Sequence, residues 1–272
     1  MNMNNRTIGF IGAGNMAEAL IRGLLTANIL PAANVRVTDV QPDRLEHMRT
    51  TYRIHGSTDN QDIVRTSDVV ILAVKPQHMS AVLAGIKDAV SADKLVISIA
   101  AGIPTGRIES ELGGVARVVR AMRNTPALVG EGAAALCPGK HASSDDVLFA
   151  ETIMGAVGIA VRVDESMMDA VTALSGSGPA YVFYVAEAMI EAGKACGLPA
   201  EVAERLTIQT IKGAGKLLAE SGEPAGVLRR NVTSPGGTTE AALRVMADRA
   251  LLDVFRDAIA AATKRGRDLS QS

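Results

Sequence analysis

The chain has 272 residues, of which 47% are hydrophobic and 21% charged, a balance typical of a folded globular protein with one large or two modest domains. Its formal net charge of -1 gives no electrostatic reason to expect a nucleic acid or an anionic membrane as a partner. The two cysteines, Cys137 and Cys196, are far apart and form neither a disulfide framework nor a metal-binding pattern, so no metal site is expected.

The beginning of the chain, "MNMNNRTIGF", does not carry the long apolar segment of a secretion signal. No apolar run reaches the roughly 20 residues that a helix needs to span a bilayer. We therefore expect a cytoplasmic protein.

The stretch "IGFIGAGNMAEAL" places a run of small residues between an apolar strand and a helix predicted over residues 15–27. The run from Gly12 to Ala17 matches the G-x-G-x-x-G/A turn that binds dinucleotides. In such a turn Gly12 makes the tight bend, Gly14 lets a pyrophosphate approach the backbone, and Ala17 lets the helix pack close to its strand.

Short apolar runs alternate with helical stretches through the first part of the chain, as a buried parallel sheet with crossover helices requires. The predicted strands contain "IGFIG", "VRVTD", "DVVILAV", "KLVISIAA", "ARVVRAM" and "GIAVRV". The last of these, at residues 158–163, closes the alternation. The pattern predicts an α/β fold whose N-terminal domain, residues 1–164, is Rossmann-like with a parallel sheet.

Asp39 ends the second predicted strand, where an acidic side chain can accept a hydrogen bond from a ribose 2′-OH and repel a 2′-phosphate. A solvated turn carboxylate before Pro42 is an equally good interpretation. Arg44, close behind, is a candidate partner for a 2′-phosphate. The segment "AVKPQ", with Lys75, follows another strand and indicates either a loop against the cofactor or an ordinary surface loop.

From Glu165 onward the sequence predicts helices only, and so a second, all-helical domain over residues 165–272. The segments "AYVFYVAEAMIEAGKACGLP" and "AEVAERLTIQTIKGAGKLLAE" are too apolar for solvated single helices, which predicts burial against a second copy of the chain. The stretch "SGSGPAY" interrupts the helical pattern, as a packing or hinge point does.

The segment "RNVTSPGGTTEAAL" places two glycines before two threonines and a helix, so unpaired backbone N–H groups converge where a carboxylate or phosphate can bind. The hydroxyls of Ser234, Thr238 and Thr239 add donors. The alternative is an ordinary glycine-rich helix start. The four histidines occur in polar stretches without a partner pattern, so no catalytic histidine is indicated.

The motifs "FIGAGNM", "AVKPQ", "NTPALVGEG", "DAVTALSGSGPAY" and "VTSPGGTTEAAL", in this order, resemble those of the pyrroline-5-carboxylate reductase family. The resemblance implies a Rossmann domain followed by a helical domain that forms a homodimer, with dimers assembling further. It implies NAD(P)H-dependent hydride transfer to the C=N bond of 1-pyrroline-5-carboxylate, giving L-proline in the last step of proline biosynthesis.

The resemblance also implies a set of site residues. The implied cofactor contacts are Ile11, Gly12, Ala13, Gly14, Asn15, Met16, Asn60, Ala73, Val74, Lys75 and Pro76, together with Asp39 if it meets the ribose. The implied substrate contacts are Pro179, Ser234, Gly236, Gly237, Thr238 and Thr239. If a proton has to be supplied, Thr239, or a water that it holds, is the candidate donor.

Two positions depart from the family pattern. Arg123 stands where the family commonly has proline, either as a harmless surface change or as a positive charge near an anionic substrate. Asp39 stands where many relatives carry a residue compatible with NADPH. The resemblance implies NADPH as the cofactor, and Asp39 leaves NADH open.

Two other functions fit parts of the pattern. A β-hydroxyacid dehydrogenase also joins a Rossmann domain to a helical domain, but Val182 stands where those enzymes carry their acid/base lysine. A non-catalytic NAD(H)-sensing module needs no second anion-binding loop such as the one at residues 234–239.

Overall fold

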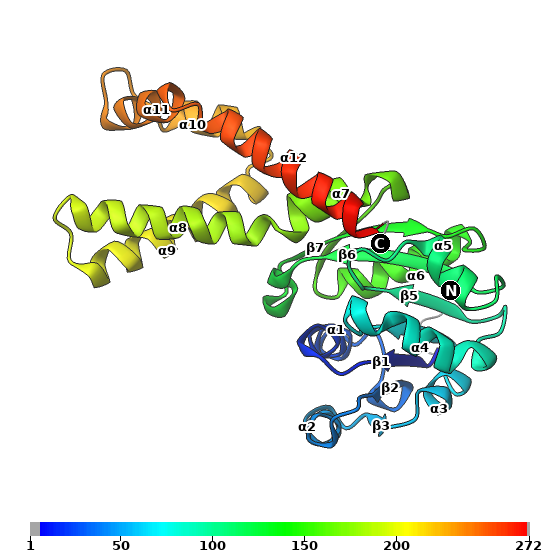
Figure 1. Ribbon diagram of the computed structural model, residues 1–272. Coiled ribbons are helices and arrows are strands. Elements are labelled where there is room, and N and C mark those ends of the chain that lie inside the picture. Colours follow the sequence, from blue (N-terminus) through cyan, green and yellow to red (C-terminus); the bar gives the residue numbers. More distant parts are fainter. Residues whose placement is uncertain (1–5, 271–272) are drawn as a thin grey trace. The chain divides into compact units, whose positions relative to one another are not determined.

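The computed structural model describes residues 6–270, which divide into two compact units (Figure 1). The first, here called the sheet unit, contains the chain up to Ser177 and its C-terminal end from Ala262. The second, the helical unit, comprises Gly178–Ala261.

The sheet unit is built on one eight-stranded sheet with the order β3-β2-β1-β4-β5-β6-β7-β8. Its strands are β1 (Ile8–Ile11), β2 (Val35–Thr38), β3 (His55–Ser57), β4 (Val69–Leu72), β5 (Leu95–Ser98), β6 (Arg117–Arg123), β7 (Gly132–Pro138) and β8 (Gly158–Arg162). Neighbours among the first six strands all pair in parallel. This is the Rossmann arrangement, and the strand order reverses between β1 and β4.

The sheet departs from the parallel arrangement at one pair, which the sequence did not predict: β7 runs antiparallel to β6, with Ala121 opposite Leu136. The two strands are joined by a short connection that contains only the 3₁₀ helix η5 (Thr125–Val129). A parallel pairing needs a crossover of a dozen or more residues, so this connection returns the chain beside the strand it has just left. Strand β8 then pairs in parallel with β7.

Helices cover both faces of the sheet. One buried cluster gathers residues from α1 (Asn15–Thr26), α2 (Pro42–Tyr52) and α6 (Ser144–Gly155). The other gathers residues from α3 (Asn60–Arg65), α4 (Met79–Ile86) and α5 (Thr105–Glu111). Because side chains alternate along a strand, β4 sends Val69 and Ile71 to the first cluster, and Val70 and Leu72 to the second. Burial on both faces explains the continuous apolar runs in the sequence.

After β8 the described chain is helical, as predicted. The elements are η6 (Glu165–Met167), α7 (Met168–Val171), the π-helical turn η7 (Thr172–Gly176), α8 (Gly178–Ala195), α9 (Ala200–Glu220), α10 (Ala225–Asn231), α11 (Thr238–Asp248) and α12 (Leu251–Ser270). The "SGSGPAY" break corresponds to the π-helical turn, which the Ser177 N–H closes by donating to the Thr172 carbonyl at 2.8 Å. A side chain at Gly176 would meet Met122, so this turn is packed against the sheet.

The helical unit leaves large apolar side chains uncovered. Within α8 to α12, only Ala203 and Thr207 are buried. Tyr184 on α8 and Leu252 on α12 are 74% and 77% exposed. Apolar surface of this extent marks a protein–protein interface. Among residues 6–270, no helix combines the length and the apolar character needed to cross a membrane.

Candidate functional site

The residues predicted to bind a cofactor collect where the parallel strands β1, β2 and β4 end. The Gly12 N–H donates to the Thr38 carbonyl of β2 at 2.9 Å, and the Ala73 N–H donates to the Ile11 carbonyl of β1 at 2.9 Å. Ligands of open α/β sheets bind outside this edge. The structure therefore brings the turn after β1 together with the segments that follow β2 and β4.

The turn after β1 has the shape that a pyrophosphate requires. Gly12 has a φ of +98°, and a Cβ atom there would lie 2.8 Å from the Ala73 carbonyl oxygen. Gly14 is the N-cap of α1, where no side chain makes a capping hydrogen bond and a Cβ atom would meet open space. The N–H groups at the start of α1 thus point outward with the positive end of the helix dipole, and the turn fits a dinucleotide.

The side chains within this turn have different surroundings. Ile11 and Ala13 are buried, so they can offer a ligand only their backbone atoms. Asn15 is exposed and Met16 is half-buried at the start of α1. After β4, Ala73 and Val74 are half-buried, whereas Lys75 and Pro76 are exposed at the start of the 3₁₀ helix η3 (Pro76–His78).

Asp39 holds the turn rather than pointing free into solvent. Its Oδ2 accepts from the Ala13 N–H at 2.8 Å, and its Oδ1 accepts from the Gln41 N–H at 3.0 Å. Beside it, the Thr38 hydroxyl donates to the Asn60 Oδ1 at 2.6 Å, which joins the end of β2 to the start of α3. Asp39 and Asn60, predicted from different segments, therefore both lie beside Thr38 at the end of β2.

A cluster of polar side chains from α1 and α2 lies behind the turn. Arg44 donates through Nε to the Ala13 carbonyl at 2.5 Å and forms an ion pair with Glu18. The Glu18 carboxylate also accepts from the Tyr52 hydroxyl at 2.9 Å and lies 2.8 Å from His47 Nε2. Of these residues, only Arg44 was predicted from the sequence; the partner of His47 and the roles of Glu18 and Tyr52 were not.

Glu18 gives the sheet unit a predicted pH dependence. Burial acts to raise the pKa of Glu18, but hydrogen bonds from His47, Arg44 and Tyr52 outweigh burial and lower the pKa to about 2. The stabilisation from the ionised carboxylate is thus complete above the ordinary pKa of 4.5 and is lost as the pH falls toward 2. In urea unfolding, wild type is expected to exceed E18Q in stability at neutral pH. That difference should shrink below pH 4.5, and a difference independent of pH would contradict the assignment.

Arg123 lies at the end of β6, at the same edge of the sheet. Its side chain is half-buried, so it is not an ordinary surface residue. Burial lowers its pKa to about 10, and its buried Nε has no hydrogen-bond partner among the described residues. The arrangement leaves a cation available at the edge where ligands bind.

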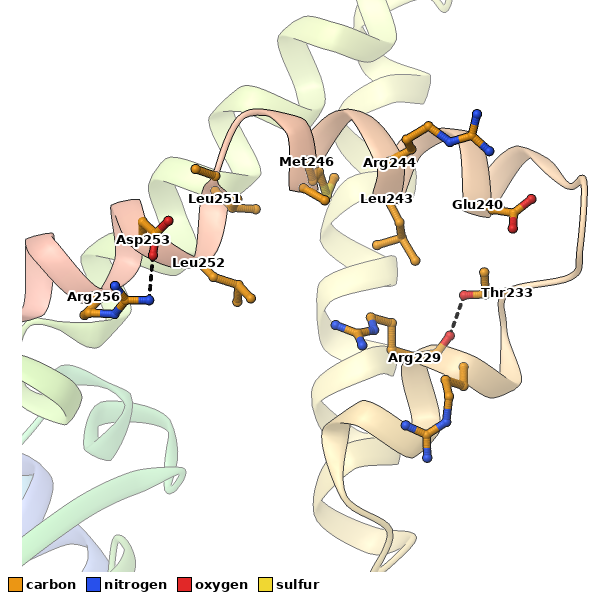
Figure 2. Close-up of a pocket in the computed structure, with 13 residues that line it drawn as sticks. Arg229, Thr233, Glu240, Leu243, Arg244, Met246, Leu251, Leu252, Asp253 and Arg256 are labelled. Atoms are coloured by element: carbon orange, nitrogen blue, oxygen red, sulfur yellow. Dashed lines mark hydrogen bonds and ion pairs between the residues drawn. The ribbon is translucent and has the colours of Figure 1, made fainter.

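The helical unit contains an open hollow of about 810 Å³ between α10, α11 and the start of α12 (Figure 2). Leucines and arginines line it together, among them Leu243, Leu251, Arg229 and Arg244. Thr233 lies on its rim and donates to the Arg229 carbonyl at 2.6 Å. The loop with Ser234 and Gly236 follows directly from Thr233.

The expectation of unpaired N–H groups in this loop is wrong for both glycines. The Gly236 N–H donates to the Glu240 Oε2 at 2.7 Å, and the Gly237 N–H donates to the Ser234 carbonyl at 3.0 Å. Figure 2 shows Glu240 on the first turn of α11 beside the loop. Gly237 is the N-cap of α11 without a side-chain cap, so Thr238 and Thr239 begin the helix. Pro179 lies elsewhere in this unit, half-buried as the second residue of α8.

Comparisons with known proteins match both parts of the chain. Residues 165–269 match the family described as pyrroline-5-carboxylate reductase dimerisation, and residues 7–102 match the family described as NADP oxidoreductase coenzyme F420-dependent. The pyrroline-5-carboxylate reductase of Methanosarcina acetivorans is 44% identical over 269 residues, which cover 99% of this chain and 100% of that protein. The chain belongs to the pyrroline-5-carboxylate reductase family. It is therefore an oxidoreductase, which sets aside the non-catalytic sensor and the β-hydroxyacid dehydrogenase.

Solved structures agree with the family assignment. A pyrroline-5-carboxylate reductase from Coxiella burnetii has a TM-score of 0.95 and 40% identity, covering 99% of this chain and 100% of that one. The Plasmodium falciparum pyrroline carboxylate reductase, solved with NADP bound, has a TM-score of 0.86 and 33% identity, covering 98% and 99%. The predicted order of a Rossmann-like domain and a helical domain is confirmed.

Proposed function

We propose that this reductase transfers hydride from NAD(P)H to the C=N carbon of 1-pyrroline-5-carboxylate and so forms L-proline. The full-length identity of 44% to a pyrroline-5-carboxylate reductase carries the proposal. Bound NAD(P)H supplies the hydride. A protonated cyclic imine is already a hydride acceptor, so the protein has mainly to orient two ligands and exclude water.

The dinucleotide is proposed to bind at the edge formed by β1, β2 and β4. The outward N–H groups at the start of α1 would hold its pyrophosphate, with Gly14 giving the space for close approach. Asn60 and Asp39 would lie on the adenosine side, and Ala73 to Pro76 along the cofactor beyond β4. NADPH is the proposed cofactor, supported by the NADP in the Plasmodium relative, and NADH stays open because of Asp39.

The substrate carboxylate is proposed to bind at Ser234, Gly236, Gly237, Thr238 and Thr239, with Pro179 lining the ring pocket. The N–H groups of the two glycines already donate hydrogen bonds within the loop. The remaining donors are the hydroxyls of Ser234, Thr238 and Thr239 and the N–H groups of Thr238 and Thr239. The loop would thus hold the carboxylate mainly through the start of α11.

The reaction is tested by following the oxidation of NADPH, and separately of NADH, at 340 nm with 1-pyrroline-5-carboxylate, and by measuring the proline that forms. Turnover with either cofactor supports the proposal, and the ratio of the two kcat/KM values measures the cofactor preference. Retention of the dinucleotide without turnover would contradict it.

For substrate that binds as the unprotonated imine, a proton has to be supplied, and Thr239 is proposed as its donor, directly or through a water that it holds. T239A is then expected to lower kcat by about 100-fold or more, because a positioned proton donor contributes on that scale. T239S keeps the hydroxyl and is expected to recover most of the rate. If T239A raises KM but leaves kcat intact, Thr239 binds the substrate and does not supply the proton.

We propose a homodimer, in which a second copy covers the apolar surface of α8 to α12, and further assembly of dimers. The match of residues 165–269 to the dimerisation family and the exposed apolar side chains support it. Sedimentation as a monomer at micromolar concentration would contradict it.

A further inference from the structure

Two opposite charges hold the dinucleotide turn at the same residue. Asp39 accepts from the N–H of Ala13, and Arg44 donates to the carbonyl of Ala13. Both side chains therefore lie at the end of β2, where the ribose 2′ position of a bound dinucleotide is read in this fold. Asp39 repels a 2′-phosphate, and Arg44 is the cation near enough to offset that repulsion.

Arg44 is not free to act as that cation. Its Nη2 pairs with the Glu18 carboxylate, which Tyr52 and His47 hold in place from α2. The Arg44 and Glu18 side chains are only 24% and 20% exposed, so solvent screens their attraction less than at an open surface. The charges of Arg44 and Glu18 offset each other, and the negative charge of Asp39 remains uncompensated.

We propose that Glu18 is a specificity-determining residue that fixes and neutralises Arg44 and thereby limits the affinity for the 2′-phosphate of NADP(H) relative to NAD(H). The inference rests on the proposed dinucleotide site. In this proposal Glu18 acts through Arg44, as a positioning residue.

The decisive variant is E18Q, which keeps the shape of the side chain and an oxygen for Arg44, but removes its charge. The ratio of kcat/KM for NADPH to that for NADH is expected to rise at least about fivefold, the effect of one partly screened charge near a phosphate. Calorimetry gives a readout without turnover. E18Q should bind 2′,5′-ADP at least about fivefold more tightly, with the affinity for 5′-AMP unchanged.

Two further variants test whether the effect passes through Arg44. In R44Q/E18Q the gain in 2′,5′-ADP affinity should disappear, because the released cation is missing. E46Q is the matched control, because it removes an acidic charge from α2, the helix that carries Arg44. The exposed Glu46 lies beside Arg49, so E46Q should leave the ratio of the kcat/KM values for NADPH and NADH unchanged. A similar gain in E46Q would assign the effect to overall charge and overturn the proposal.

The remaining outcomes separate the proposal from the site on which it rests. If neither wild type nor any variant binds 5′-AMP or 2′,5′-ADP, the proposed dinucleotide site is wrong. If both nucleotides bind, but E18Q leaves the ratio of 2′,5′-ADP affinity to 5′-AMP affinity unchanged or lowers it, the proposed role of Glu18 is wrong. Should E18Q fail to fold, E18A takes its place, since it also removes the charge of Glu18. The same gain in 2′,5′-ADP affinity over 5′-AMP affinity is then expected, and its absence would overturn the proposal.

Discussion

Substituting alanine for Gly12 is expected to destabilise the protein by about 1–3 kcal/mol, the cost of a non-glycine residue held in a strained conformation. The φ of +98° disfavours any Cβ atom, and the Ala73 carbonyl oxygen would lie 2.8 Å from it. The segment after β4 must shift to relieve this contact, and it belongs to the proposed cofactor site. We therefore also expect NADPH affinity to fall about tenfold or more, measured by calorimetry beside urea unfolding.

The matched control is G14A, two residues along the same turn. Gly14 has a φ of -64° and open space around its Cβ position, so alanine meets no clash and should cost less than about 1 kcal/mol, the penalty of alanine at a helix N-cap. Its methyl group would nevertheless occupy the space proposed for the pyrophosphate, and NADPH affinity should fall. Wild-type affinity in G14A would show that the pyrophosphate does not approach there.

Replacing Asp146 by alanine is expected to cost about 3 kcal/mol of stability, because it removes the buried carboxylate of an ion pair whose guanidinium is half-buried. Asp146 on α6 is 2% exposed, and its Oδ1 accepts from Arg117 Nη1 of β6 at 2.6 Å. Its Oδ2 accepts from the N–H and hydroxyl of Ser143 at 2.8 and 2.7 Å. Arg117 Nε is already buried without a partner, so D146A leaves that guanidinium with two unsatisfied nitrogens. Urea unfolding measures the loss.

Two variants of the same region separate the contributions. S143A removes the helix cap but keeps the ion pair, and should cost only about 1 kcal/mol. E151Q, also on α6, weakens the half-exposed pair with Arg162 and should cost much less than D146A. Equal losses in D146A and S143A would assign the effect to the cap alone.

Most of the Rossmann-like core could be predicted because its signals are local. A glycine turn between an apolar run and a helix is visible over a dozen residues, and continuous apolar strands reveal a sheet covered on both faces. Strand β7 was not recognised because its sequence, "GAAALCP", consists mainly of alanine and glycine. Its antiparallel direction depends on how little chain separates it from β6, which composition does not reveal.

The cluster around Glu18 could not be predicted, because Glu18 and Arg44 are far apart in sequence and meet only through the packing of α1 beside α2. The hydrogen bond of the Gly236 N–H, by contrast, could have been predicted from the sequence. Glu240 is the third residue of α11 after its glycine cap, and an acid at that position commonly reaches back to a free N–H. That local signal was present in the sequence and was missed.

The division of the chain into units also bears on how the protein is made. The sheet unit ends at Ser177 and resumes at Ala262, within α12 (Figure 1). Ser270 on the last turn of α12 donates to the Asp169 carboxylate of α7 at 3.3 Å. A nascent chain therefore emerges from the ribosome with most of its sheet unit first and the closing turn of that unit last. Native packing around Asp169 becomes complete only after every residue of the helical unit has been synthesised.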